Sequence, residues 1–196
     1  MITGNEILFR KINENNILYA VLDYEKNNLE ILVDKDSRKR LLCLLVDDGF
    51  HKTKKRNHDI YLYGMDVFEY YQKSDLQFTI CYQLACRSTL HGEWVPLDRI
   101  VNTTALNSAV KDSNEISILN PIDAICYLLA KSVYTEGCFS SEKVYKISEL
   151  YKSIDKSYLY KKLNLIFFNY TPHMIQHIEN NDYDNIISDF WSYGEY

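Results

Sequence analysis

Two side chains that can supply oxygen ligands stand two residues apart in the stretch NNLEILV, where Asn28 and Glu30 flank a leucine. If this stretch is a β-strand, residues i and i+2 point to the same face, so the amide and the carboxylate lie side by side. Oxygen atoms of this kind are ligands of Mg²⁺. The sequence therefore predicts a candidate metal site at Asn28 and Glu30, in which the neutral amide contributes no charge.

Further acids lie beside this stretch and could act as displaced ligands. Asp23 and Glu25 precede it, and Asp34 and Asp36 follow it. Asp23 and Glu25 form the better pair, because positions i and i+2 of an extended chain face the same way. The alternative is that these acids only solvate a turn and cap a helix. If these acids do act as ligands, Asp23 is the candidate that would assist Glu30 in catalysis.

A basic stretch, HKTKKRNHD (51–59), offers candidate contacts for an anionic cofactor. Lys52, Lys54 and Arg56 could bind the phosphates of a nucleotide or an acidic protein surface. The alternative is a solvated hairpin whose lysines prevent pairing with other strand edges. The basic segment KDSRKR (35–40) would extend the patch into an anion-binding groove if the two segments are neighbours in the fold.

Two other patterns could support chemistry but lack partners in the sequence. His173 and His177 have the i, i+4 spacing that lets two imidazoles on a helix share zinc. No third ligand is evident, and the intervening MIQ lacks the glutamate of a metalloprotease, so we interpret them as exposed helix residues. Cys81 is a candidate nucleophile, but no base can be assigned to it.

Composition limits the class of protein. The chain has 196 residues, 46% of them apolar, which suits one domain or one domain with a helical addition. A net charge of −5 makes nucleic acid an unexpected partner, although a local basic patch remains open. Five cysteines without a C-x-x-C pair indicate a reducing cytoplasm. No apolar run reaches the roughly 18 residues that cross a bilayer, so no membrane association is expected.

The elements that position the candidate residues are predicted from periodicity. Thr3 and Glu6 have capping-box spacing, which predicts a helix of about three turns. Segments 17–23 and 29–33 are predicted as antiparallel strands, because only a short polar turn joins them. The following helix ends at Gly49. Further strands are predicted within 50–55, 59–72, 76–86 and 115–119.

Alternation in LQFTICYQLAC places Gln77, Thr79 and Cys81 on one strand face and apolar residues on the other. After Asn120-Pro121, a typical helix start, the period changes to 3.6. We therefore predict an α+β fold with a mixed, largely antiparallel sheet and flanking helices. The predicted domains are residues 1–119, with the sheet, and residues 120–196, a helical region packed on it.

The order of these elements resembles the nucleotidyltransferase superfamily, which has the polymerase-beta-like fold. YAVLDYEKNNLEILVDKDSRKRLLCLLVDDGF carries the first half of the resemblance, and LQFTICYQL and ISILNPIDAICYLLAKSVY carry the second. The pattern covers roughly residues 5 to 150. It is most similar to a subgroup of uncharacterised bacterial nucleotidyltransferase-like proteins.

The resemblance implies a metal site and a nucleoside triphosphate substrate. In the family, two strand carboxylates at i and i+2 and a third from a neighbouring strand hold divalent metal ions about 3.5–4 Å apart. Carried over to this chain, the pair falls on Asn28 and Glu30 and the third ligand on Thr79. One carboxylate stands in place of three. The glycine-serine turn that holds the triphosphate is also missing, since YAVLDYE contains no glycine.

Three functions follow from these observations. The first is a nucleotidyltransferase-fold protein with a degenerate metal site that binds a nucleotide, a phosphorylated small molecule or a protein partner, with weak or no catalysis. The second is an active nucleotidyltransferase that uses Glu30, Asn28 and Asp23 with Mg²⁺ and modifies a small molecule, a sugar phosphate or a protein. The third is an interaction protein that uses its basic hairpin and helical tail.

Overall fold

The computed structural model describes residues 6–25, 27–53, 61–62, 65–66, 68–87 and 94–193. The chain gathers into two compact units, which are described separately. The first unit comprises residues 1–84 and 102–120, and the second comprises residues 85–101 and 121–196. The contacts thus add residues 85–101 to the helical unit, and the predicted boundary between two domains at residues 119 and 120 stays a prediction.

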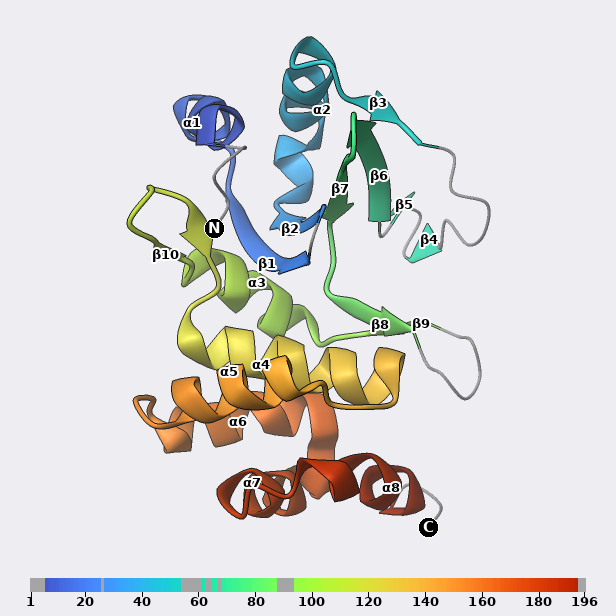
Figure 1. The fold of residues 1–196 in the computed structure, drawn as a ribbon, viewed down its shortest axis with the longest axis vertical. Helices are drawn as coiled ribbons and strands as arrows, with labels where there is room; N and C mark the ends of the chain where they lie inside the picture. The colour runs from blue at the N-terminus through green and yellow to red at the C-terminus, as the bar shows by residue number, and fades with distance from the viewer. Residues whose placement is uncertain are drawn as a thin grey trace. The chain divides into compact units, whose positions relative to one another are not determined.

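In the described part of the first unit, seven strands form one sheet in the order β10-β11-β1-β2-β7-β6-β3 (Figure 1). Its elements in chain order are α1 (Glu6–Glu14), β1 (Tyr19–Glu25), β2 (Asn28–Val33), the 3-10 turn η1 (Lys35–Ser37), α2 (Arg38–Asp47), β3 (His51–Lys52), β4 (Tyr61–Leu62), β5 (Met65–Asp66), β6 (Phe68–Lys73), β7 (Leu76–Cys81), residues 102–107 of α3 (Arg99–Asn107), β10 (Val110–Lys111) and β11 (Ser117–Ile118). Strands β4 and β5 pair separately.

The strand directions confirm the predicted fold class. Neighbouring strands of the large sheet are antiparallel except for β1 with β11 and β2 with β7, which are parallel. The sheet is therefore mixed and largely antiparallel, as the sequence predicts. Helix α3 and strand β10 lie in a segment where the sequence pattern is irregular, and neither was predicted.

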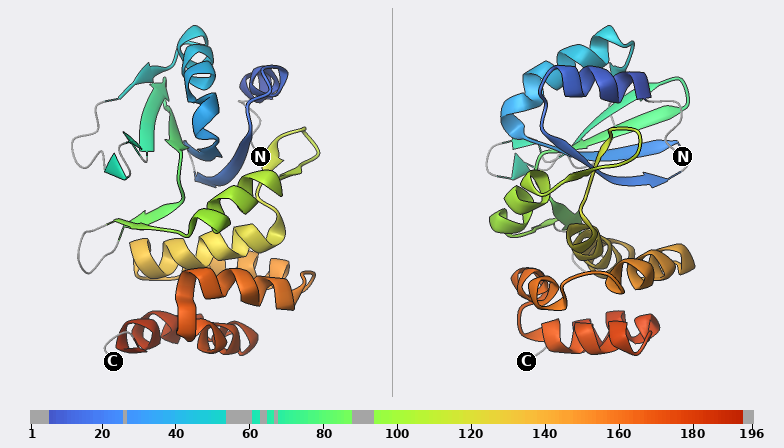
Figure 2. Two further views of the ribbon diagram at one scale, coloured as in Figure 1. Left: turned by 180° about the vertical axis from the view of Figure 1, so that it is seen from behind. Right: turned by 90° about the vertical axis from the view of Figure 1, so that its left-hand side faces the viewer.

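Helices α1 and α2 cover one face of the sheet (Figures 1 and 2). The apolar positions of β2 and β7 alternate onto this face, where Leu29, Ile31, Phe78 and Ile80 are fully buried. They pack with the apolar stripes of both helices in one core. Helix α2 ends where predicted, because Gly49 adopts a left-handed φ of +88° that favours glycine.

The second unit is helical, as predicted for the C-terminal part. It contains a hairpin and seven helical segments within the described residues: β8 (Ala85–Arg87), β9 (Trp94–Pro96), α4 (Pro121–Ala130), the π-helix η2 (Lys131–Glu136), α5 (Ser141–Tyr151), α6 (Lys156–Phe167), the 3-10 turn η3 (Phe168–Tyr170), α7 (Thr171–Glu179) and α8 (Tyr183–Tyr193). Helix α4 begins with Pro121, and its Asp123 forms a buried ion pair with Lys162 of α6. All five cysteines are free thiols. Within the described residues, none of the helices has the length and hydropathy of a membrane span.

Candidate functional site

The candidate site lies on the face of the sheet opposite α1 and α2. Strand β2 pairs with β7 in parallel register, so that Asn28 is the partner of Gln77 and Glu30 is the partner of Thr79. Paired residues of neighbouring strands point to the same face. The three positions that the sequence assigns to a metal site, Asn28, Glu30 and Thr79, therefore share one face of adjacent strands.

Three neutral side chains form a closed hydrogen-bonded cluster on this face. The Asn28 side-chain oxygen Oδ1 accepts a hydrogen bond from Gln77 Nε2 at 2.9 Å and another from Thr79 Oγ1 at 3.0 Å. Gln77 Nε2 also donates to Thr79 Oγ1 at 3.2 Å. We call Asn28, Gln77 and Thr79 the amide cluster. Each of the three side chains is hydrogen-bonded to the other two, and none carries a charge.

The amide cluster does not fit a two-metal centre. An amide oxygen has two lone pairs, and both of those on Asn28 face hydrogen-bond donors. Asn28 could bind a cation only after losing these bonds. Within the residues that the structure describes, no group of three or more histidine, cysteine, aspartate or glutamate side chains is arranged to hold a metal ion.

Two carboxylates lie next to the amide cluster. Asp23 of β1 is the register partner of Glu30 of β2, directly after a β-bulge between Val21 and Asp23. The bulge shifts the register by one residue, which turns Asp23 onto the face of Glu30. Glu30 is 9% exposed. Asp23 Oδ1 also accepts a hydrogen bond from the backbone N–H of Tyr24 at 3.0 Å. The structure thus brings together the predicted residues Asp23, Glu30, Asn28 and Thr79.

Lys52 lies on the other face of the sheet. It is the register partner of Tyr71, and Tyr71 pairs with Phe78 in the core. The predicted cofactor-binding residues Lys52 and Thr79 are therefore on opposite faces and do not form one site. Lys54 and Arg56 lie outside the described residues.

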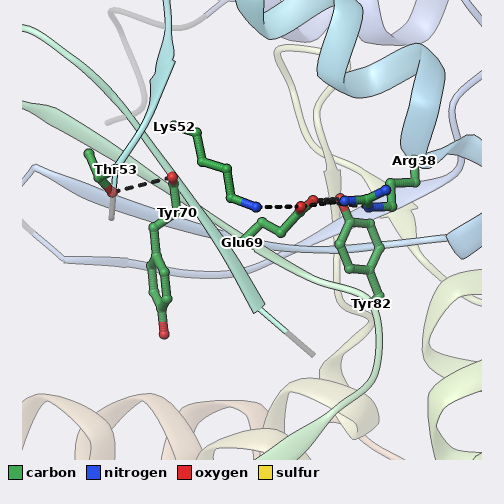
Figure 3. Close-up of polar contacts among 6 residues, drawn as sticks. All are labelled: Arg38, Lys52, Thr53, Glu69, Tyr70 and Tyr82. Carbon is green, nitrogen blue, oxygen red and sulfur yellow. Dashed lines mark hydrogen bonds and ion pairs between the residues drawn. The ribbon is translucent and has the colours of Figure 1, made fainter. Parts of the chain in front are cut away.

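Lys52 contributes to a second polar group, which is centred on Glu69 of β6 (Figure 3). The Glu69 side chain is 1% exposed. It accepts hydrogen bonds from Arg38 at 2.5 and 3.1 Å, from Lys52 Nζ at 3.1 Å and from the Tyr82 hydroxyl at 2.7 Å. Figure 3 shows that the neighbouring side chain, Tyr70, points away from this group. We call Glu69, Arg38, Lys52 and Tyr82 the Glu69 network.

The Glu69 network keeps its carboxylate charged. Burial alone raises the pKa of Glu69, but the hydrogen bonds from Arg38, Tyr82 and Lys52 outweigh it, so the pKa lies below its ordinary value. Burial, together with the hydrogen bond to Glu69, raises the pKa of Tyr82. The network connects the start of α2 with β3, β6 and the chain after β7. We therefore interpret its role as structural.

Sequence reasoning missed several of these residues. It placed Gln77 on the face of Thr79 but did not assign it to the site. Glu69 was also missed, although an acid within the aromatic strand FEYYQ is an available signal. His177 was interpreted as exposed, but its side chain is 15% exposed, with Asp182 at 3.0 Å and Asp189 at 2.9 Å from its two ring nitrogens.

Comparisons with known proteins support the fold. No protein-family model matches the chain, and neither does any curated protein. The solution structure of the antibiotic-resistance factor ANT(2'')-Ia aligns with a TM-score of 0.51 and 9% identity, over 92% of this chain and 99% of that one. The lincosamide antibiotic adenylyltransferase LnuA aligns with a TM-score of 0.44 and 12% identity, over 79% of this chain and 99% of that one. The first likeness shows the fold alone: this chain has a nucleotidyltransferase-like fold. The second has a TM-score too low to support any argument.

Proposed function

We propose that this chain is a nucleotidyltransferase-fold protein with an incomplete metal site, which binds a nucleotide or a phosphorylated small molecule and has weak or no nucleotidyl transfer activity. The observation that supports the proposal is the amide cluster, in which Asn28 and Thr79 bind each other at the positions that the family resemblance assigns to carboxylates. Nucleic acid is not proposed as a partner, because the net charge is −5.

The physical reason is the charge of the site. Phosphoryl transfer enzymes position the triphosphate and stabilise its charge with metal ions, and they add little other chemistry. A site with two amides and a hydroxyl can donate hydrogen bonds to a ligand but cannot neutralise a triphosphate through two bound cations. Binding without metal-dependent turnover is therefore the function that these side chains support best.

A second candidate function is an active nucleotidyltransferase that holds a single Mg²⁺. It is favoured by the register of Asp23 with Glu30, which places two carboxylates opposite each other on adjacent strands. Like charges at such positions repel each other, and a divalent cation between them would remove the repulsion. The acceptor in this case is a small molecule, a sugar phosphate or a protein.

Thermal unfolding with each of ATP, CTP, GTP and UTP, in Mg²⁺ and in EDTA, tests the proposal. A ligand at 100 times its dissociation constant stabilises a protein by about 2.7 kcal/mol. We expect at least one nucleotide to raise the midpoint equally in Mg²⁺ and in EDTA. A shift that requires Mg²⁺ and disappears in both Asp23→Asn and Glu30→Gln would support the second candidate instead. No shift with any nucleotide would overturn nucleotide binding in both candidates and leave a phosphorylated small molecule or a protein as the partner.

The proposed location is the cytoplasm. It is supported by the five free thiols, two of them exposed, since oxidising compartments favour disulfides in chains of this kind.

A further inference from the structure

A pocket of about 360 Å³ lies on the helical unit, formed by the end of α5, the first turns of α6, and α7. Its walls include Tyr151, Tyr160 and Ile175, and its charged side chains are Lys156, Lys161 and Glu179. The pocket is built from residues of this unit alone. Its volume lies in the range of small-molecule sites, about 300–1,000 Å³.

One wall of the pocket is held in place by a shared carboxylate. Glu179 Oε1 accepts a hydrogen bond from the Tyr151 hydroxyl at 3.0 Å and pairs with Lys156 Nζ at 3.3 Å. Lys156 Nζ lies 4.6 Å from the centre of the Tyr151 ring. The hydrogen bond from Tyr151 lowers the pKa of Glu179, followed by the effect of Lys156, so the carboxylate is charged at neutral pH. Tyr151 is only 8% exposed and Lys156 covers its ring, so the exposed aromatic side chain of the pocket is Tyr160, at 42%. The charges of Lys156 and Glu179 neutralise each other.

One positive charge in the pocket, that of Lys161 on α6, is not neutralised by an ion pair. Lys161 is exposed, and none of the ion pairs formed among the described residues involves it. Among the side chains that line the pocket, two lysines and one glutamate sum to one positive unit. The backbone N–H groups of Ser157 and Tyr158 at the start of α6 already bind Asp155 Oδ1, at 2.9 and 3.2 Å. Attraction for an anion in this pocket therefore comes from Lys161.

We propose that this pocket binds a small aromatic anion. A planar ring would lie against the exposed ring of Tyr160, and a carboxylate or phosphate on the ligand would pair with Lys161. The carboxylate of an aromatic acid and the phosphate of a mononucleotide share this chemistry. The site is separate from the amide cluster and does not depend on the function proposed for it.

Amide chemical shifts of the full chain in ¹H–¹⁵N spectra test this inference with benzoate and AMP as probes. Benzamide serves as the neutral control for the ring, and acetate as the control for the charge alone. We expect benzoate or AMP to shift amides near residues 151–161 and 175–179 in a saturable manner, and benzamide and acetate to bind at least about tenfold more weakly. Benzoate alone would identify an aromatic acid as the ligand class, and AMP alone a nucleotide. Shifts of amides near β2 and β7 would report binding at the amide cluster separately, so each of the two proposals can be refuted without the other.

Variants identify the groups responsible. Lys161→Glu should weaken binding about tenfold or more, because it reverses the charge that pairs with the anion. Tyr160→Ala should weaken it about tenfold by removing the stacking surface. Lys146→Glu, the same change at an exposed lysine of α5 outside the pocket, should leave the affinity within about twofold. Equal binding of benzoate and benzamide, an unchanged affinity in Lys161→Glu, or no binding of either anion up to about 10 mM would overturn the proposal.

Discussion

Thr79 donates a hydrogen bond to the side-chain oxygen of Asn28 across the parallel strands β2 and β7, over 3.0 Å. The bond pairs the hydroxyl of Thr79, which is 6% exposed, with the side-chain oxygen of the partly buried Asn28. Clustered carboxylates at the same positions would repel one another until a cation bound between them. The amide cluster has no such requirement, because its three side chains are neutral and hydrogen-bonded to one another.

Introducing carboxylates should convert the amide cluster into a cation site. The double variant Asn28→Asp with Thr79→Asp places two new acids beside Glu30, and three carboxylates at this spacing should bind Mg²⁺. We expect lower stability than the wild type in EDTA, because like charges repel, and recovery of the melting temperature in Mg²⁺. The single variant Asn28→Asp serves if the double variant does not fold. A melting temperature that is independent of Mg²⁺ in both would contradict this expectation.

Loss of the buried carboxylate at Glu69 should destabilise the protein. Glu69→Gln weakens the bonds from Arg38, Lys52 and Tyr82, and of these donors the Tyr82 hydroxyl is buried and would be left poorly paired. The expected loss is about 2–3 kcal/mol in the free energy of unfolding, measured by urea denaturation. The matched change at an exposed position, Glu14→Gln in α1, should stay within about 0.5 kcal/mol. Equal effects of the two changes would show that the Glu69 network contributes nothing.

The same network predicts the direction of a pH effect. The pKa of Glu69 lies below its ordinary value of 4.5, so its contribution to stability is complete above that pH and is lost as the pH falls through the lowered pKa. The free energy of unfolding of the wild type should therefore fall below about pH 4.5, in part through Glu69. The difference in the free energy of unfolding between the wild type and Glu69→Gln should shrink as the pH falls through the same range. A difference that stays constant down to pH 3 would exclude this linkage.

The buried pair of Asp123 and Lys162 should be essential to the helical unit. Their side chains are 1% and 5% exposed, so removal of one partner leaves a buried charge without its counter-ion. Asp123→Asn should cost about 3–5 kcal/mol in the free energy of unfolding, measured in urea. Replacing both, as Asp123→Leu with Lys162→Met, should give a protein more stable than the Asp123→Asn variant. If Asp123→Asn were instead the more stable variant, the cost of leaving Lys162 without its counter-ion would be smaller than this account predicts.

Much of the fold and part of the candidate site follow from local periodicity. Alternation with a period of two places Asn28 with Glu30, and Gln77 with Thr79, whatever the rest of the chain does. The pairing of β2 with β7 is not local, but the family resemblance supplied the expectation that they are neighbours; their parallel direction was not predicted. The convergence of Asn28, Glu30 and Thr79 could therefore be predicted, and the structure places them as expected.

The contacts between distant segments could not be predicted in this way. Arg38 and Glu69 are 31 residues apart in sequence, and no local pattern links them. Lys52 was predicted to contact a cofactor because it lies in a basic segment, but which face of an edge strand it takes depends on register. The bulge that turns Asp23 towards Glu30 is likewise a matter of register that alternation alone does not reveal.

A calorimetric titration of Mg²⁺ into the wild-type protein, repeated with Glu30→Gln, tests the central proposal most directly. The neutral amide cluster predicts no saturable heat in the millimolar range for either protein. Saturable binding to the wild type with a submillimolar dissociation constant, abolished by Glu30→Gln, would contradict the proposal and show a working metal site on this face of the sheet.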